Sequence, residues 1–314
     1  MVDRHLRTPY SDEFTMGFER EIHPEAVLSV RYVRRDYRDQ LQDVDVHEVR
    51  IDPRTGELAD RIGLYEPPVR VGANPTRLPD GRPDLFIQNI FFNEVLKVGN
   101  TNEARYHAVE LELRKRLSHR WQMLGSYTYS RAVGSAEDFQ SQLGNDPSTV
   151  ESEFGYLDYD QRHVVKMNLS TFLPRDWQVG VSGSWSSGLP YSVMSRFFAL
   201  DNADYQQFRT RYGFTDFDGT SLRFHSLQRN SERNNAVLDL NAKGRKNFVL
   251  GRNVAALSSE VFNILNTDDL RIVSYEPNRF GGFDPATFSQ ISASTIDATR
   301  RFGRRYQIGF QIQF

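Results

Sequence analysis

The chain has 314 residues, of which 39% are hydrophobic and 25% are charged, and its formal net charge is −2. A charge so close to neutral gives no basic field for nucleic acid and no acidic tail, so we expect no nucleic-acid partner. The absence of cysteine excludes disulfides, thiolate metal sites and a cysteine nucleophile. No apolar run approaches the roughly 20 residues of a membrane helix, and the first residues lack the apolar core of an export signal.

Alternation of apolar and polar residues marks strands, because successive side chains of a strand point to opposite faces of the sheet. By this criterion the sequence predicts four hairpins followed by a single strand. The strands are expected at residues 14–22 with 26–35, 105–117 with 121–130, 164–172 with 177–188, 234–244 with 254–265, and finally 304–314. The predicted fold class is therefore all-β, an antiparallel meander of about nine to ten strands.

The terminal strand alternates most regularly. One of its faces carries apolar side chains and the other carries mainly glutamine: Tyr306, Ile308, Phe310, Ile312 and Phe314 against Gln307, Gly309, Gln311 and Gln313. A soluble sheet buries such an apolar row, whereas a membrane barrel turns it towards lipid and turns the polar row towards its lumen. The alternation alone leaves both interpretations open.

The connections between the strands favour the membrane interpretation. Turns within hairpins are short, except for a longer one expected at residues 245–253, whereas the connections between hairpins span about 35–102, 132–158, 190–231 and 267–300. Long loops are uncommon in compact domains, but outer-membrane barrels pair short periplasmic turns with long extracellular loops. We therefore predict an open, curved sheet that forms part of a transmembrane β-barrel, with its first and last strands not paired to each other.

Two details follow from this prediction. Trp121 and Trp177 each open a returning strand directly after a tight turn, where an aromatic girdle at a membrane interface would place them, although core tryptophans are an alternative. Residues 43–51 and 86–96 retain strand propensity, so the first long connection is expected to carry short strands that extend the hairpins beyond the membrane.

Several segments carry a family resemblance. They include YHAVELELRKRLSHRWQMLGSYTYSRAVG, SSEVFNILN and RRYQIGFQIQF, and the most specific are YDQRH at Tyr159–His163 and SGLPY at Ser187–Tyr191. These segments resemble the C-terminal barrel of TonB-dependent outer-membrane receptors. More narrowly, they resemble the Oar-like group, whose members often carry an N-terminal carboxypeptidase-regulatory-like domain. The resemblance spans most of the chain.

The resemblance implies energised uptake of a scarce solute through a barrel of about 22 strands, plugged by an N-terminal domain that the TonB complex pulls upon. The location implied is the outer membrane of a Gram-negative bacterium, and the partners are outer-membrane lipid, the plug and, through the plug, TonB. Residues 1–314 are expected to be a partial barrel domain, inactive alone, that lacks the signal peptide, the plug and the early strands. The transported solute is not readable from the sequence.

Two groups of charged residues are candidates for contacts inside the barrel. Glu110, Glu112, Arg114 and Arg116 alternate with the predicted lipid-facing row, so they are expected to line a hydrated lumen and to contact the plug. A second group could form a polar cluster at the mouth of the lumen, where an ion-pair network is favoured over direct ligand contact: Asp158, Asp160, Arg162 and His163.

No catalytic or cofactor motif appears, so we expect neither an enzyme nor a bound cofactor. Asp43, Asp45 and His47 share a strand face, and Asp216 and Asp218 begin a calcium-loop pattern that lacks its remaining ligands. Solvated loop carboxylates are the favoured interpretation of both. The alternative to the barrel is a soluble all-β binding or adhesion module, in which the apolar rows would face a common core instead of lipid.

Overall fold

The computed structural model describes residues 1–46, 48–49, 63–64, 86–87, 95–139, 141, 143, 153–198, 221–225, 228–284, 289–300 and 302–313. Every element with assigned bounds in these ranges is a β-strand. Within the same ranges, no helix is long and apolar enough to cross a membrane.

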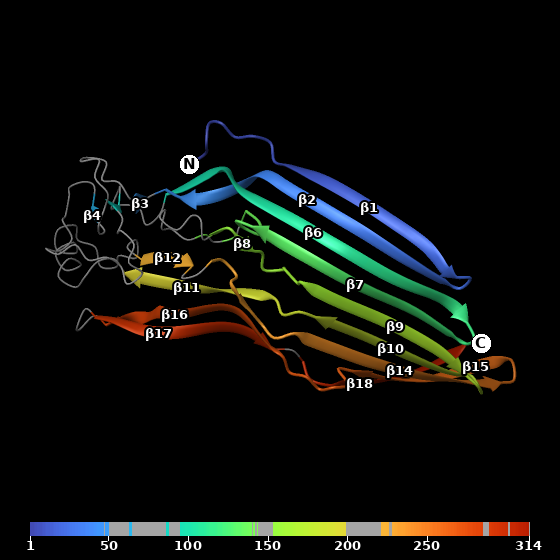
Figure 1. Cartoon of the computed structure of the whole chain (residues 1–314). Helices are drawn as coiled ribbons and strands as arrows, with labels where there is room; N and C mark the ends of the chain where they lie inside the picture. Colours follow the sequence, from blue (N-terminus) through green and yellow to red (C-terminus); the bar gives the residue numbers. More distant parts are fainter. Residues whose placement is uncertain are drawn as a thin grey trace.

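The main sheet has ten strands in the order β1-β2-β6-β7-β9-β10-β14-β15-β18, with β8 beside β7 (Figure 1). Each pairing in it is antiparallel, and β1 and β18 are its two edges. The strands are β1 (Tyr10–His23), β2 (Ala26–Asp45), β6 (Leu96–Ser118), β7 (Trp121–Gly134), β8 (Gly155–Tyr156), β9 (His163–Leu173), β10 (Trp177–Ser186), β14 (Val237–Leu250), β15 (Asn253–Phe262) and β18 (Arg305–Gln313). The predicted open antiparallel meander is confirmed.

Tight turns join the strands at one end of this sheet (Figure 1). His119 and Arg120 both have positive φ, 48° and 67°, which is the geometry of a two-residue turn that matches the twist of its strands. The longer turn predicted at residues 245–253 is wrong, because β14 continues to Leu250 and the turn consists of Gly251 and Arg252 alone. Gly251 adopts a φ of 66°, which glycine reaches without steric cost.

Two smaller sheets lie at the other end (Figure 1). One has the order β12-β11-β16-β17, with β13 beside β11, and the other has the order β3-β5-β4. Their strands are β3 (Glu48–Val49), β4 (Gly63–Leu64), β5 (Phe86–Ile87), β11 (Pro190–Phe198), β12 (Ser221–His225), β13 (Glu232–Arg233), β16 (Leu270–Asp284) and β17 (Ser289–Arg300).

Short strands lie where expected in the first long connection, as β3 and β5, and β2 reaches Asp45 while β6 begins at Leu96. The rest of the two segments expected to form strands, residues 47, 50–51 and 88–94, lies outside the described residues. The strands in the last two long connections were not predicted. Among them, β11 and β16 pair in parallel, through Ser192 with Ser274 and Val193 with Tyr275.

Cross-strand partners show that the main sheet has one apolar and one polar face, because residues directly opposite each other project to the same side. One row crosses six strands as Val30, Leu111, Tyr127, Val165, Trp185 and Leu238. The neighbouring row on the other side runs as Ser29, Glu112, Ser126, Lys166, Ser184 and Asp239. The pleat thus separates apolar from polar side chains across the whole width of the sheet.

The apolar face is uncovered. Within the described residues the buried apolar side chains are only Val33, Ala108, Ala132, Ala136, Leu157, Ala255 and Ala256. In contrast, Phe18 is 63% exposed and Ile308 is 77% exposed. Extended exposed apolar surface of this kind marks contact with a membrane or another protein. The apolar rows do not face a common core, which contradicts the alternative of a soluble all-β module.

Candidate functional site

The polar face of β6 carries the first predicted group. Glu110 accepts a hydrogen bond of 2.8 Å from Nε of Arg31 on β2, within an ion pair between the two side chains. Arg114 donates from Nη2 to Oε1 of Glu112 at 2.7 Å. Arg116 is exposed at the end of β6, beside the tight turn. Glu110, Glu112 and Arg114 therefore belong to a surface of alternating charge. Contact of the predicted group with a plug or a solute stays a prediction.

A hollow of about 320 Å³ opens on this polar face. A second ion pair lies in it, between Nε of Arg35 and Oε2 of Glu13 at 2.8 Å. Its lining comes from three neighbouring strands and one loop: Glu13, Thr15, Arg31, Val33, Arg35, Tyr37, Tyr106, Glu110 and Tyr159. The hollow combines paired charges with three phenol rings, so it suits a polar ligand or a polar protein segment.

Tyr159 reaches this hollow from the segment between β8 and β9. Burial raises the pKa of its hydroxyl, and the charge of Glu137 raises that pKa further. Tyr159 opens the YDQRH motif, but its role could not be inferred from local sequence because its neighbours in the hollow belong to β1, β2 and β6. Arg31 and Arg35 were missed for the same reason, although they share the register of Glu110 on the polar face.

Asp160 is the most deeply buried residue of the second predicted group. Its side chain is fully buried, and its Oδ1 accepts a hydrogen bond of 2.6 Å from the backbone N–H of Ala132. Arg233 forms an ion pair with its Oδ2, and Nε of Arg162 lies 3.6 Å from the same oxygen. Arg233 also donates to the carbonyl oxygen of Gly188 at 3.3 Å. A buried carboxylate thus joins the ends of three strands with the SGLPY motif.

Three arginines surround the ring of Tyr156, next to this carboxylate. The guanidinium carbons of Arg131, Arg162 and Arg233 lie 5.5, 4.6 and 4.9 Å from the ring centroid. Such cation–π contacts attract each guanidinium to the face of the ring. The arrangement fixes Arg162 and Arg233 in position to neutralise Asp160.

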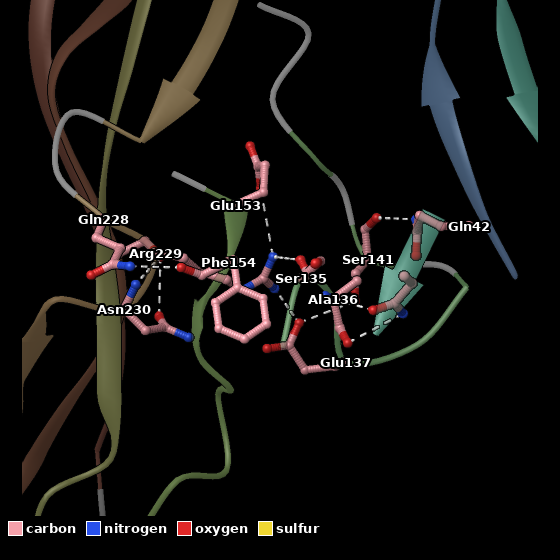
Figure 2. Close-up of polar contacts among 12 residues, drawn as sticks. Gln42, Ser135, Ala136, Glu137, Ser141, Glu153, Phe154, Gln228, Arg229 and Asn230 are labelled. Carbon is pink, nitrogen blue, oxygen red and sulfur yellow. Dashed lines mark hydrogen bonds and ion pairs between the residues drawn. The ribbon is translucent and has the colours of Figure 1, made fainter. Parts of the chain in front are cut away.

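A second buried network follows along the same end of the sheet (Figure 2). The side chain of Arg229 is 7% exposed, and it forms ion pairs with Glu137 and with Glu153, the latter at 3.7 Å. It also donates to the carbonyl oxygen of Ser135 at 2.7 Å. Removal of charged groups from water is costly unless partners compensate, so these contacts hold the segment before β13 in one place.

Asp158 belongs to this network. Its Oδ1 accepts a hydrogen bond of 2.7 Å from Nδ2 of Asn230, and its backbone N–H donates to Oε1 of Glu137 at 2.9 Å. Gln42 on β2 extends the network by donating to the carbonyl oxygen of Ser141 at 3.1 Å, as Figure 2 shows. Hydrogen bonds therefore join the long connections at this end of the sheet to one another and to β2.

His163 does not join these clusters. It pairs with Tyr129 across β7 and β9, so its side chain lies on the apolar face, opposite to that of Arg162. Its Nδ1 lies 2.9 Å from the hydroxyl of Tyr127, and its ring centroid is 5.3 Å from that of Tyr129. Successive residues of a strand point to opposite sides, so the expected cluster of four is physically divided.

Aromatic rings border the apolar face at two levels. Trp121 and Tyr129 on β7 are eight residues apart, as are Trp177 and Trp185 on β10. Eight residues cover about 26 Å along a strand, or about 20 Å across a membrane at the usual tilt of barrel strands. This height is close to the apolar band of outer-membrane barrels, about 25 Å, which aromatic girdles flank. Trp121 and Trp177 lie at the end with the tight turns, as expected.

The metal hypotheses find no support within the described residues, which contain no group of three or more His, Asp or Glu side chains placed to hold an ion. Asp45 accepts a hydrogen bond of 3.1 Å from the backbone N–H of Val95, and Asp43 accepts one of 3.0 Å from Gln42. His47, Asp216 and Asp218 lie outside the described residues.

The two-faced sheet, the girdles and the tight turns at one end define the wall of a transmembrane β-barrel. The family described as the outer membrane β-barrel domain matches residues 1–307, and the chain belongs to this family. Its location is the outer membrane of a Gram-negative bacterium. The sequence matches none of the curated proteins with which it was compared.

Three solved structures are among those similar to the chain. The outer membrane transporter YddB from Escherichia coli is 12% identical over 98% of this chain and 33% of its own, with a TM-score of 0.48. The siderophore receptor PiuA from Acinetobacter baumannii is 10% identical over 96% and 28%, with a TM-score of 0.45. The pyoverdine outer membrane receptor FpvA from Pseudomonas aeruginosa is 10% identical over 98% and 30%, with a TM-score of 0.43. The chain thus spans about a third of each structure's length.

Proposed function

We propose that residues 1–314 form part of the barrel wall of a TonB-dependent outer-membrane receptor of the Oar-like group, which takes up a polar solute. The observation that carries this proposal is the separation of the sheet into an uncovered apolar face and a face of paired charges. Lipid is the natural partner of the first face. The second requires a hydrated lumen, because charges such as Arg31 and Glu110 are stable only in water or against polar partners.

The remaining partners belong to the same proposal. The charged lumenal surface would contact a plug domain, and TonB would act through that plug rather than on the barrel wall. The free edges of β1 and β18 would pair with further strands, because unpaired backbone groups cannot face hydrocarbon. Neither a cofactor nor a catalytic step is part of this proposal.

Uptake measurements test the transport role. Cells with the gene for a complete receptor that contains residues 1–314 and cells without that gene would be supplied with labelled polar solutes too large for general porins, with TonB present or absent. We expect accumulation of at least one solute that requires both the gene and TonB. Uptake that is independent of TonB would contradict energised transport, and adding the gene without any change in uptake would contradict transport altogether.

Single-cysteine labelling tests which face meets water. The sequence contains no cysteine, so every introduced thiol is unique. Leu111 and Glu112 are neighbours on β6 that point to opposite faces. We expect a membrane-impermeant maleimide to label Glu112→Cys much faster than Leu111→Cys in intact outer membranes. Faster labelling of Leu111→Cys would reverse the assignment of the lumen.

A further inference from the structure

The tight turns form a basic rim, which we define as Arg120, Arg175 and Arg252. Three successive hairpins each place one of these arginines in the turn itself. All three residues are exposed. None of them forms an ion pair with another described residue, in contrast to Arg31 and Arg35 on the lumenal face. Their guanidinium groups are therefore available to an external anion.

The acidic residues of this end do not neutralise the rim. Glu25 already lies 3.8 Å from both Nζ of Lys115 and Nδ1 of His119, and it accepts a hydrogen bond from the hydroxyl of Ser118. Glu21 and Asp176 are exposed, and they are fewer than the three arginines of the rim. The rim therefore carries a net positive charge although the chain as a whole is slightly acidic.

Two lysine–tryptophan contacts fix the depth of the rim in the membrane. Nζ of Lys115 lies 4.0 Å from the ring centroid of Trp121, and Nζ of Lys246 lies 5.8 Å from the ring centroid of Trp177. All four of these residues are on the apolar face, directly inside the turns. Tryptophan settles at the boundary between hydrocarbon and headgroups. The arginines of the turns are the next layer outward, which is the level of the lipid phosphates.

We propose that the basic rim is a binding site for the phosphate groups of anionic phospholipids in the leaflet at the tight-turn end. Arginine matches phosphate with two parallel hydrogen bonds, and basic groups next to a membrane attract anionic lipid. Spacing of one arginine per hairpin would distribute the lipids along the wall. This inference rests on the membrane placement of the apolar face and not on solute transport.

Tryptophan quenching tests the rim in the purified chain held in mixed detergent micelles. The chain has three tryptophans, so Trp185→Phe leaves Trp121 and Trp177 as reporters at this end. Phosphatidylglycerol and phosphatidylcholine, each brominated near the top of the acyl chains, would be titrated separately. We expect phosphatidylglycerol to quench at a lower mole fraction, and high salt to reduce the difference.

In the same background, the triple variant Arg120→Gln, Arg175→Gln and Arg252→Gln should lose at least about tenfold in relative affinity for phosphatidylglycerol, because each basic residue contributes several-fold. The matched control removes three arginines at the other end, through Arg7→Gln, Arg38→Gln and Arg105→Gln, and should retain the preference.

Three outcomes would overturn the proposal. The first is equal quenching by the two lipids in the starting protein. The second is loss of the preference on adding inorganic phosphate but not on adding chloride of equal ionic strength, which would identify a site for free phosphate. The third is the absence of quenching by either lipid, which would contradict the membrane placement itself. Each of these is distinguishable from a failure of the uptake experiment, which measures transport alone.

Discussion

The guanidinium of Arg233 pairs with the fully buried carboxylate of Asp160, 73 positions away in the sequence. Asp160 lies between β8 and β9, and Arg233 belongs to β13, so the pair joins two of the long connections at one end of the sheet. The carboxylate also accepts a hydrogen bond from the backbone N–H of Ala132 on β7. One side chain thus links the wall of the barrel to the segments that border its opening.

Loss of this pair should destabilise the fold strongly. Arg233→Gln leaves the buried carboxylate with Arg162 alone, and breaking a buried pair on one side costs about 3 to 5 kcal/mol. We expect a decrease of this size in the free energy of unfolding, measured by urea titration in phospholipid bilayers of a barrel completed by further strands. Adding Asp160→Asn should restore part of the loss, because no buried charge then remains.

The matched control for that measurement is Arg7→Gln. Arg7 lies 3.6 Å from Asp39, but its side chain is 75% exposed, and exposed ion pairs contribute about 0 to 1 kcal/mol. If Arg7→Gln and Arg233→Gln had equal effects, the Asp160 contact would not be the structural link inferred above.

Gly188 of the SGLPY motif should not tolerate a side chain. A Cβ at this position would overlap the backbone carbonyl of Asn234, whose own N–H donates a hydrogen bond to the carbonyl oxygen of Leu189 in the motif. We expect Gly188→Ala to lower the free energy of unfolding by about 1 to 3 kcal/mol, as overpacking does. Gly125→Ala is the control, because no atom lies within 4 Å of a Cβ there. Equal stability of the two variants would show that the close approach is unimportant.

The wall of the barrel was predictable because the alternation of apolar and polar residues within each strand shows which side chains meet lipid and which meet water. Alternation placed Phe310 and Gln311 on opposite faces, and the cross-strand pairs of β18 with β15 agree with this placement. The same rule divides Arg162 from His163, yet their nearness in sequence suggested a common cluster. Alternation within a strand was therefore more informative than proximity along the chain.

The networks at the long-loop end were not predictable. Asp160 and Arg233 meet only when two long connections fold together. No local sequence pattern predicts a partner 73 residues away. The turn expected at residues 245–253 was too long, because β14 continues to Leu250. Lys246 instead lies beside the ring of Trp177 on the neighbouring strand. Contacts between elements decided these features, and a single sequence records them only after the topology is known.

Acid should weaken the first tight turn through Glu25. The hydroxyl of Ser118 donates a hydrogen bond to Glu25 and, together with the charges of Lys115 and His119, holds the pKa of its carboxyl below the usual value of 4.5. The folded state therefore favours the ionised form. The resulting stabilisation is complete above the usual pKa and is lost as the pH falls through the lowered pKa.

The comparison of wild type with Glu25→Gln isolates this effect. The difference between their free energies of unfolding should be constant above about pH 5 and should vanish in stronger acid. Ser118→Ala removes the largest cause of the lowered pKa, so it should reduce the acid-dependent part of the difference. A difference that stayed constant down to the acid limit of the experiment would contradict the assignment.

The last strand tests the lipid face most directly. Phe310 pairs with Leu257 on the apolar face and is 67% exposed, whereas Gln311 pairs with Ala256 on the polar face. A one-residue slip would turn the glutamines of β18 towards hydrocarbon, so the register is strongly determined. Arginine on a lipid-facing site near the membrane centre costs about 2 to 4 kcal/mol.

We therefore expect Phe310→Arg to impair folding into bilayers by about that amount, whereas Gln311→Arg should have a much smaller effect because its side chain meets the lumen. The prediction assumes a barrel completed by further strands, and urea titration of that barrel in bilayers gives both values under one set of conditions. Phe314, the last member of the predicted apolar row, lies outside the described residues, so its outward placement stays a prediction. Equal damage from Phe310→Arg and Gln311→Arg would mean that the two faces of β18 share one environment, and the outward placement of Phe310 would be wrong.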